Sequence, residues 1–174
     1  MENIKKLPSL TLGESIKSVL GNLTNFKGRA RRSELWWYWL AYFIVMMVLA
    51  FVLGAFPVVL SVIAFLLQLT TWSVTVRRLH DRGHSGWWVA ASIIIGLISN
   101  IYIMQSGYYE AMSTINPNIE EATEVLRGPV FPTLGFLSFI VNITIFVFCV
   151  RDGKPEDNKY GPSPKYIPNE LADE

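Results

Sequence analysis

The chain has 174 residues, of which 51% are hydrophobic and only 17% are charged, against about 25% charged in average globular domains. Its formal net charge of +1 excludes nucleic-acid binding through bulk charge, and its single cysteine excludes an intramolecular disulfide and a multi-cysteine metal site. No apolar run follows the N-terminal lysines, so we expect no cleavable signal peptide. The composition predicts one domain that enters a membrane through internal segments.

The first predicted element is a short amphipathic helix within residues 11–23. Its apolar residues recur at helical spacing, at Leu12, Ile16, Val19, Leu20 and Leu23. Thr11 and Glu14 have the spacing of a capping box at its start. Two placements stay open: the helix lies on the inner membrane surface, or it packs against the ends of the spanning helices.

Four membrane-spanning helices are predicted from the gaps between charged residues. The 42 residues between Glu34 and Arg77 carry no charge, and as one helix they would measure about 63 Å, twice the hydrocarbon thickness of a bilayer. The chain must therefore fold back, and residues 54–57, which end in proline, are the expected break. Further charge-free stretches follow Ser85 and Arg127. The predicted spans are residues 35–56, 58–76, 86–104 and 129–150.

Basic residues predict the orientation of these spans. With four spans, 14 of the 15 Lys and Arg residues fall on one side: seven in residues 1–34, three in 77–84 and four in 151–174. Basic loops stay in the cytoplasm, so both termini are expected there. All six tryptophans lie near the cytoplasmic ends of the spans, at Trp36, Trp37, Trp39, Trp72, Trp87 and Trp88.

The predicted fold is therefore an all-α, polytopic membrane protein in three parts. A cytoplasmic N-terminal segment, 1–34, precedes a four-span membrane domain, 35–150, and a cytoplasmic tail, 151–174. The third connection, 105–128, is expected to hold a short extracytoplasmic helix with Asn116 as its cap and Pro117 in its first turn. We interpret the glutamates of that helix as a solvated acidic face. The tail is rich in proline, glycine and charge, and is expected to be extended.

Two basic runs at the cytoplasmic interface hold the candidate functional residues. One run, 28–34, leads into the first span, and the other, 77–88, links the second and third spans. Guanidinium groups bind phosphate bidentately, and basic clusters at this surface attract anionic lipid. The candidate residues for binding an anionic head group are Arg29, Arg31, Arg32, Arg77, Arg78, His80, Asp81, Trp87 and Trp88.

In this interpretation the arginines supply charge, His80 and Asp81 orient them, and the tryptophans seat the head group. The protein is then a non-enzymatic membrane protein that binds anionic lipid or a phosphate-bearing partner. The structural alternative is that the arginines set the topology and pair with Glu34 and Asp81.

Two chemical alternatives use the same histidine-rich segment. His80, Asp81 and His84 could bind a metal if the segment were helical, but Gly83 and Gly86 favour a loop and no third ligand is evident. His80 and Asp81 could instead be the acid–base pair of a lipid-modifying enzyme, although no nucleophile is evident. We assign no catalytic residue, no metal and no cofactor.

A small channel or transporter subunit is the remaining alternative. The predicted spans contain no acidic or basic residue, whereas proton relays and ion pathways usually need one. A pore would need mild polar side chains such as Gln68, Asn100 and Asn142, whose default role is hydrogen bonding between helices. The expected partners are membrane lipids, with a homo-oligomer or other membrane proteins as further candidates, and no nucleic acid.

Three ordered motifs carry a family resemblance. Residues 26–36 match F-x-G-R-A-R-R-x-E-F-W closely, residues 77–81 and 85–88 match R-R-L-H-D-x-x-x-S-G-W-W, and residues 158–164 match N-x-Y-G-x-x-P. Over roughly residues 15–165 the chain thus resembles the YhaH/YhaI-type bacterial inner-membrane proteins, a domain of unknown function. The resemblance implies a multi-span protein of the bacterial cytoplasmic membrane with no established activity.

Two departures from the family pattern stand out. The family commonly has Lys or Arg where this chain has His84, which weakens the metal alternative further. The acidic outer helix, about residues 116–127, is longer than the family's usual connection.

Overall fold

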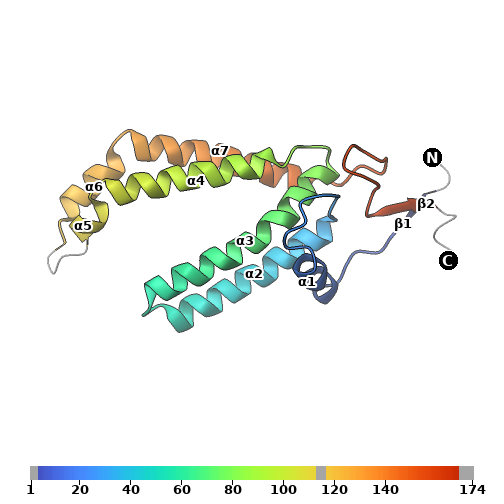
Figure 1. Cartoon of the computed structure of the whole chain (residues 1–174), viewed down its shortest axis with the longest axis horizontal. Coiled ribbons are helices and arrows are strands. Elements are labelled where there is room, and N and C mark those ends of the chain that lie inside the picture. The colour runs from blue at the N-terminus through green and yellow to red at the C-terminus, as the bar shows by residue number, and fades with distance from the viewer. Residues whose placement is uncertain (1–3, 113–116, 169–174) are drawn as a thin grey trace. The chain divides into compact units, whose positions relative to one another are not determined.

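The computed structural model describes residues 4–112 and 117–168, and this part of the chain is mainly helical. Its elements in chain order are β1 (Ile4–Lys6), α1 (Leu12–Leu20), α2 (Arg32–Leu53), α3 (Pro57–Asp81), α4 (Trp87–Gln105), α5 (Tyr108–Met112), α6 (Ile119–Arg127), α7 (Val130–Val150) and β2 (Tyr166–Pro168) (Figure 1). The chain forms two units. Unit one holds the residues up to Gly86 and those from Phe148 onward, and unit two is Trp87–Val147.

Four helices, α2, α3, α4 and α7, are long and apolar enough to cross a membrane, which confirms the predicted fold class. At most 22% of the most apolar window of any of them is buried within the protein. Large apolar side chains such as Phe51, which is 92% exposed, therefore point outward along these helices. Soluble monomers rarely expose apolar patches of this extent, whereas a bilayer would cover them.

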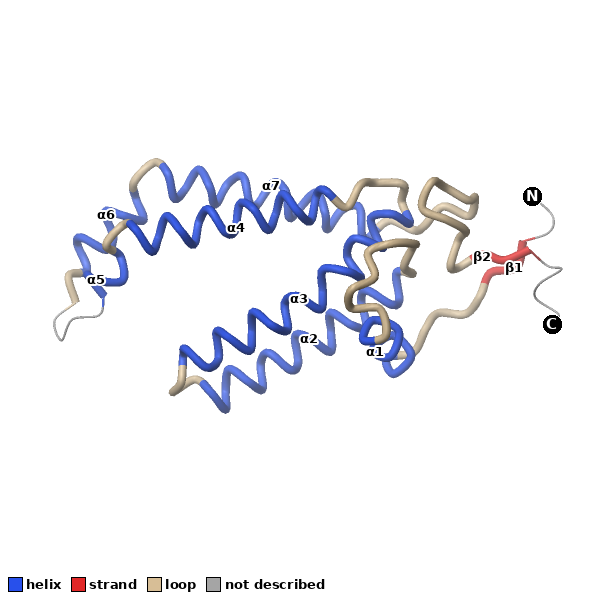
Figure 2. Tube along the Cα trace, in the orientation of Figure 1, coloured by secondary structure: helices blue, strands red, loops and turns tan. Residues whose placement is uncertain are grey.

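The helix boundaries follow the chemistry of the sequence, with one difference that matters for the site. The expected break is present, because α2 ends at Leu53 and α3 begins with Pro57 in its first turn (Figure 2). Helix α3 does not stop at Val76 but continues to Asp81, and Gly83 follows with a φ of +82°. The charged residues 77–81 stay helical because their side chains find partners inside unit one.

Helix α1 packs against the start of α2, and the capping box of Thr11 and Glu14 is confirmed. Ser15 and Val19 are fully buried on the packed side, and the Ser15 hydroxyl donates to the Ser33 carbonyl at 3.4 Å. Leu20, on another side of α1, is 51% exposed. Of the two predicted placements, the contacts support packing against a spanning helix, and they leave an apolar stripe facing outward.

The core of unit one is the C-terminal part of α3. Every residue from Ser73 to Asp81 is buried, and Val74 and Leu79 are fully enclosed. This stretch is unusual for a core because Arg77, Arg78, His80 and Asp81 lie within it. The charged end of α3 is therefore an internal structure and not an open surface.

The C-terminal tail is folded, and the expectation that it is extended is wrong. Strand β2 pairs antiparallel with β1, with Lys6 opposite Tyr166, and the Leu7 amide donates to the Lys165 carbonyl at 2.9 Å. A turn between Asn158 and Gly161 is closed by backbone hydrogen bonds in both directions. The N-terminal and C-terminal segments thus lie side by side (Figure 1). The tail folds through long-range partners, which local periodicity does not reveal.

Unit two contains the predicted short helix of the third connection, as α6. Asn118 caps it and accepts a hydrogen bond from the Glu121 amide at 3.2 Å. The predicted cap, Asn116, lies outside the described residues, and the helix begins at Ile119. Ser92 of α4 donates to Asn142 of α7 at 3.1 Å, so polar side chains of two apolar helices pair with each other.

Candidate functional site

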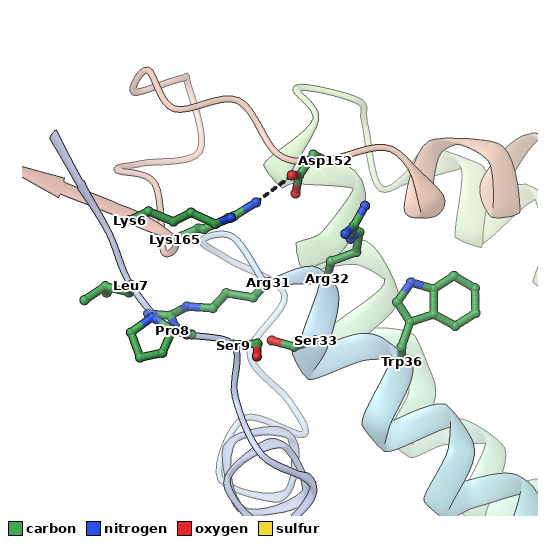
Figure 3. A pocket seen from close by; sticks show the side chains of 10 residues that line it. All are labelled: Lys6, Leu7, Pro8, Ser9, Arg31, Arg32, Ser33, Trp36, Asp152 and Lys165. Carbon is green, nitrogen blue, oxygen red and sulfur yellow. Dashed lines mark hydrogen bonds and ion pairs between the residues drawn. The ribbon is translucent and has the colours of Figure 1, made fainter. Parts of the chain in front are cut away.

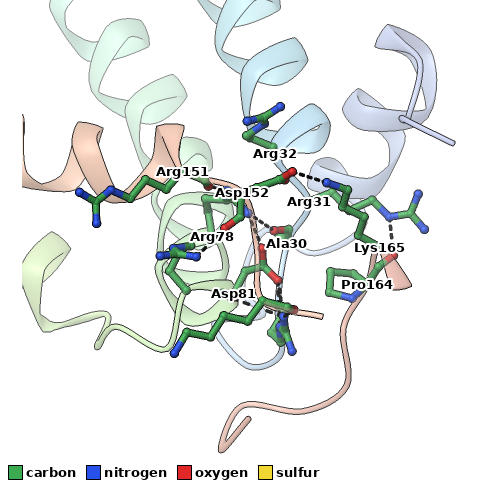
Figure 4. Close-up of polar contacts among 12 residues, drawn as sticks. Ala30, Arg31, Arg32, Arg78, Asp81, Arg151, Asp152, Pro164 and Lys165 are labelled. Carbon is green, nitrogen blue, oxygen red and sulfur yellow. Dashed lines mark hydrogen bonds and ion pairs between the residues drawn. The ribbon is translucent and has the colours of Figure 1, made fainter. Parts of the chain in front are cut away.

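Asp81, the last residue of α3, lies between two buried arginines. Arg29 places Nη2 2.8 Å from Oδ1 and donates from Nε to the same oxygen at 2.9 Å. Arg78 pairs with Oδ2 through Nη1 (Figure 4). All three side chains are at most 3% exposed. Because both carboxylate oxygens are engaged, Asp81 is the anchor of an internal ion cluster.

The remaining donors of the two arginines go to backbone carbonyls, mostly those of the tail. Arg29 donates to the carbonyls of Glu156 at 2.9 Å, Gly161 at 3.3 Å and Lys154. Arg78 donates to the carbonyls of Cys149 at 3.2 Å, Ala30 at 3.5 Å and Arg151. A backbone carbonyl accepts a hydrogen bond from a guanidinium group but does not neutralise its positive charge. Hydrogen bonds from charged donors are among the stronger ones in proteins. The cluster therefore fastens the tail to the end of α3.

Gly153 lets the tail pass directly over Asp81. A Cβ atom at this position would collide with the Asp81 carboxylate, so a larger residue would displace either the carboxylate or the tail. The Lys154 amide also donates to the Asp81 carbonyl at 3.4 Å.

A second buried ion pair joins α1, α2 and α3. Arg77 lies 3.0 Å from Glu34, and both side chains are 6% exposed. The Ser18 hydroxyl of α1 donates to the same Glu34 oxygen, Oε1, at 3.1 Å. The Arg77 carbonyl accepts from the Ala30 amide at 3.0 Å. This pair, like the pairs of Arg29 and Arg78 with Asp81, agrees with the structural alternative, in which the arginines pair with Glu34 and Asp81.

Both histidines are packed against aromatic rings. His80 stacks on Tyr160 with centroids 3.7 Å apart, and its Nδ1 lies 3.2 Å from the Gly28 carbonyl. His84 lies beyond the end of α3 and stacks on Phe148, also at 3.7 Å. Burial lowers the pKa of His84, and nearby cationic side chains lower it further. Within the described residues, no group of three His, Cys, Asp or Glu could hold a metal.

The nine candidate residues divide between the two units. Arg29, Arg77, Arg78, His80 and Asp81 come together inside unit one and are each at most 8% exposed. Trp87 and Trp88 begin α4 in unit two, where they are 77% and 36% exposed. Arg31 and Arg32, at the start of α2, are the two candidate arginines that reach the surface of unit one.

Arg31 and Arg32 line a pocket of about 250 Å³, which we call the rim pocket (Figure 3). Three segments form its walls: the N-terminal segment, the start of α2 and the tail. The lining residues are Lys6, Leu7, Pro8, Ser9, Arg31, Arg32, Ser33, Trp36, Asp152 and Lys165. Four of these side chains are cationic and one is a carboxylate, so the lining has an excess of positive charge.

Two of these four cationic side chains donate to neutral backbone carbonyls. Arg31 donates to the carbonyls of Pro8, at 2.8 Å, and Pro164, and so holds two walls of the pocket together. Arg32 donates to the Val150 carbonyl at 3.2 Å. Lys165 alone is paired with a carboxylate of the lining, Asp152, at 2.6 Å.

The pair of Lys165 and Asp152 is the exposed one among the ion pairs described here. The side chain of Asp152 is 47% exposed, against at most 6% for the buried carboxylates. The hydrogen bond from Lys165 lowers the pKa of Asp152, and the charges of Lys165, Arg32 and Arg78 lower it further against an opposing effect of burial.

Sequence reasoning missed the pocket residues contributed by the two chain ends, Lys6, Asp152 and Lys165. The N-x-Y-G-x-x-P motif at residues 158–164 was the one sequence feature that drew attention to the tail. Its Asn158 donates to the His80 carbonyl at 3.0 Å, and its Tyr160 stacks on the His80 ring. The N-x-Y-G-x-x-P motif of the tail thus supplies two residues that contact the R-R-L-H-D motif at the end of α3.

Comparison with known proteins places this architecture in a family. The family model described as "Protein of unknown function (DUF805)" matches residues 23–162. The chain is 27% identical to the inner membrane protein YhaH of Escherichia coli K12 over 162 residues, covering 86% of this chain and 95% of that protein.

It is 28% identical to the inner membrane protein YhaI of the same strain over 156 residues, covering 87% of this chain and 96% of the relative. The uncharacterized protein YiiR of that strain is 30% identical over 142 residues, covering 80% and 85%. No solved structure matches significantly. The chain therefore belongs to the DUF805 family of proteins of unknown function, among whose members are inner membrane proteins.

Proposed function

We propose that this inner-membrane protein has both termini in the cytoplasm and uses a basic cytoplasmic rim to bind the phosphate-bearing head groups of anionic lipids. The rim consists of the cationic side chains at the start of α2 and on the segments that contact it, namely Lys6, Lys17, Lys27, Arg31, Arg32 and Lys165. The buried arginines build the scaffold that presents this rim.

The proposed orientation is supported by two independent features. Strands β1 and β2 pair, so the two terminal segments lie on the same side of any membrane that the helices cross. An even number of spans meets this requirement, in agreement with the four apolar helices. The side that holds both termini carries 14 of the 15 basic residues, which favours the cytoplasm.

The observation that carries the binding proposal is the excess of cationic side chains at the surface where α2 begins. Lys6, Lys17, Lys27 and Arg32 are all exposed there. Basic residues close to an anionic membrane surface each contribute about 1 kcal/mol of attraction. The first two turns of α2 also carry Trp37 and other tryptophans, which suit the head-group region.

The geometry gives less support to a lipid-modifying enzyme. Both oxygens of Asp81 are occupied by arginines, and His80 is stacked and in contact with a backbone carbonyl. Neither residue lines the rim pocket. An acid–base pair must reach its substrate, and these two side chains are enclosed.

The polar side chains of the apolar helices favour packing over a pore. Tyr42 donates to Gln68 at 2.8 Å, and Tyr38 donates to Thr70 at 2.6 Å, between α2 and α3. Hydrogen bonds of this kind stabilise contacts between spanning helices.

Thermal unfolding of the purified full-length protein in mild detergent tests the proposal. A ligand that binds the folded state raises the unfolding midpoint. We expect phosphatidylglycerol to raise the midpoint, phosphatidylethanolamine to leave it unchanged, and added salt to weaken the effect because it screens surface charge. Equal midpoints with the two lipids would contradict the proposal.

A further inference from the structure

We infer that the rim pocket is the specific binding site for the phosphate group of an anionic phospholipid. When the pocket is empty, Asp152 pairs with Lys165 in place of that phosphate. This inference rests on the proposed function and assigns it to one site. Five observations on unit one support it.

First, the pocket differs from the buried arginine cluster in what its cations contact. Arg29, Arg77 and Arg78 are paired with carboxylates and enclosed. In the pocket, Arg31 and Arg32 donate to backbone carbonyls, which carry no net charge. An anion that enters therefore meets positive charge without having to break a buried ion pair.

Second, hydrogen-bond donors accompany the charge. The hydroxyl groups of Ser9 and Ser33 line the pocket (Figure 3). Helix α2 begins in the same wall, and its N-cap, Arg31, makes no capping hydrogen bond with its side chain. The first backbone amides of a helix that lacks a side-chain cap attract anions, because they have no acceptor within the helix.

Third, part of the lining is apolar, which fits a lipid better than free phosphate. Leu7, Pro8 and Trp36 line the pocket beside the charged groups. Trp36 lies in the second turn of α2, a helix apolar enough to cross the membrane, and packs edge-on against Trp39 with centroids 6.1 Å apart. A head group held here would have its glycerol and acyl chains directed toward the apolar part of α2.

Fourth, Asp152 is positioned as an internal competitor. It accepts a hydrogen bond from Lys165 at 2.6 Å, and nearly half of its side chain is exposed. Exposed ion pairs are weak, so a phosphate that gains several cationic partners can replace this carboxylate. Replacement leaves Asp152 in solvent and gives Lys165 a new anionic partner.

Fifth, the pocket requires both chain ends in their folded positions. Lys6 and Lys165 come from paired segments, and the Leu10 amide donates to the Ser33 hydroxyl at 3.1 Å. Arg31 bonds to carbonyls on both sides. The site is therefore assembled by the same contacts that dock the termini on α2.

Because Asp152 competes with the phosphate, removing Asp152 and removing a cation of the pocket should change the lipid affinity in opposite directions. Asp152→Asn removes the competitor, so we expect phosphatidylglycerol to bind several-fold more tightly. Arg32→Gln and Lys165→Gln each remove one cation and should weaken binding about fivefold. Lys159→Gln is the matched control, because Lys159 is an exposed cation of the same tail that does not line the pocket. It should bind like the wild type.

The measurement is native mass spectrometry of the full-length chain titrated with phosphatidylglycerol in detergent micelles, with inorganic phosphate as competitor. Unfolding midpoints of the free variants show that each is folded, and a misfolded protein could not bind more tightly, as Asp152→Asn should. Inorganic phosphate should displace the lipid poorly, because it makes no contact with the apolar wall.

Each other outcome overturns a defined part of the account. If all variants bind phosphatidylglycerol like the wild type, or Lys159→Gln weakens binding as much as Arg32→Gln, the pocket assignment is wrong while the proposed rim function stands. Weaker binding by Asp152→Asn would refute the competition. Efficient displacement by inorganic phosphate would refute the lipid as the source of the phosphate. If the wild type binds phosphatidylethanolamine equally well, both the pocket and the proposed function fail.

Discussion

Replacing Asp81 with Asn removes one negative charge from between two buried guanidinium groups while preserving the size of the side chain. Asp81 is 2% exposed, and the side chains of Arg29 and Arg78 are each 1% exposed. The variant leaves two cations facing each other without an anion. We expect it to destabilise unit one and to loosen the tail that these arginines hold.

The magnitude follows from the contacts that remain. Removing one partner of a buried ion pair costs about 3–5 kcal/mol. The lower end applies here, because Arg29 and Arg78 each keep carbonyl acceptors in addition to Asp81. At about 2–4 °C per kcal/mol for chains of this length, a loss of about 3 kcal/mol lowers the unfolding midpoint by about 6–12 °C.

The assay is thermal unfolding of the purified protein in detergent, with Asp157→Asn as the matched control. Asp157 is an exposed carboxylate of the same tail, so its removal should change stability by no more than about 0.5 kcal/mol. Hydrogen exchange locates the effect, because the Lys154 amide donates to the Asp81 carbonyl and should exchange faster in Asp81→Asn. Equal midpoints for the two variants would refute the buried ion cluster as a source of stability.

Three further predictions follow from unit one. Gly153→Ala should lower the unfolding midpoint, because its Cβ collides with the Asp81 carboxylate; an unchanged midpoint would show that the tail does not pass so closely. Gly13→Ala should raise stability by about 0.5–1 kcal/mol, since it lies in α1 with open space around its Cβ, and a lower midpoint would contradict this. The lowered pKa of His84 means that its contribution to stability is complete above about pH 6.5 and is lost as the pH falls toward the folded pKa; His84→Phe, followed by unfolding at several pH values, should reduce this loss, and an unaltered pH profile would exclude it.

The apolar helices were predictable because a span is a property of a contiguous stretch. Charge-free gaps predict α2, α3, α4 and α7, and a proline identifies the turn before α3. The end of α3 was not predictable in this way. The charges from Arg77 onward suggested that the helix had reached the membrane surface. In the structure the helix continues to Asp81, because Glu34 pairs with Arg77, Arg29 pairs with Asp81, and the Cys149 and Arg151 carbonyls accept from Arg78.

The candidate site was predictable in composition but not in role. The sequence placed Arg29, Arg78 and Asp81 near one another, and it offered their mutual pairing as the structural alternative. Whether these residues bind a ligand or pair with one another depends on whether another part of the chain buries them. The tail buries them, and it lies about 70–130 residues away along the chain. A pattern within one sequence carries no direct signal for contacts of that separation.

The rim pocket was also not predictable from the sequence, because its residues are even farther apart along the chain. Lys6 and Lys165 come from opposite ends of the chain and meet only because β1 pairs with β2. Short strands of three residues at each end leave little periodicity to detect. The composition of the tail, rich in proline and glycine, suggested an extended segment, although its glycines serve close approach and tight turns at Gly153 and Gly161.

Native mass spectrometry of the full-length protein, released from mild detergent in an equal mixture of phosphatidylglycerol and phosphatidylethanolamine, tests most directly whether the basic rim at the start of α2 binds anionic lipid at one pocket. We expect the wild type to retain one phosphatidylglycerol molecule and the Arg32→Gln/Lys165→Gln variant to lose it. A lipid-free wild-type protein, or one that retains the two lipids equally, would contradict this expectation.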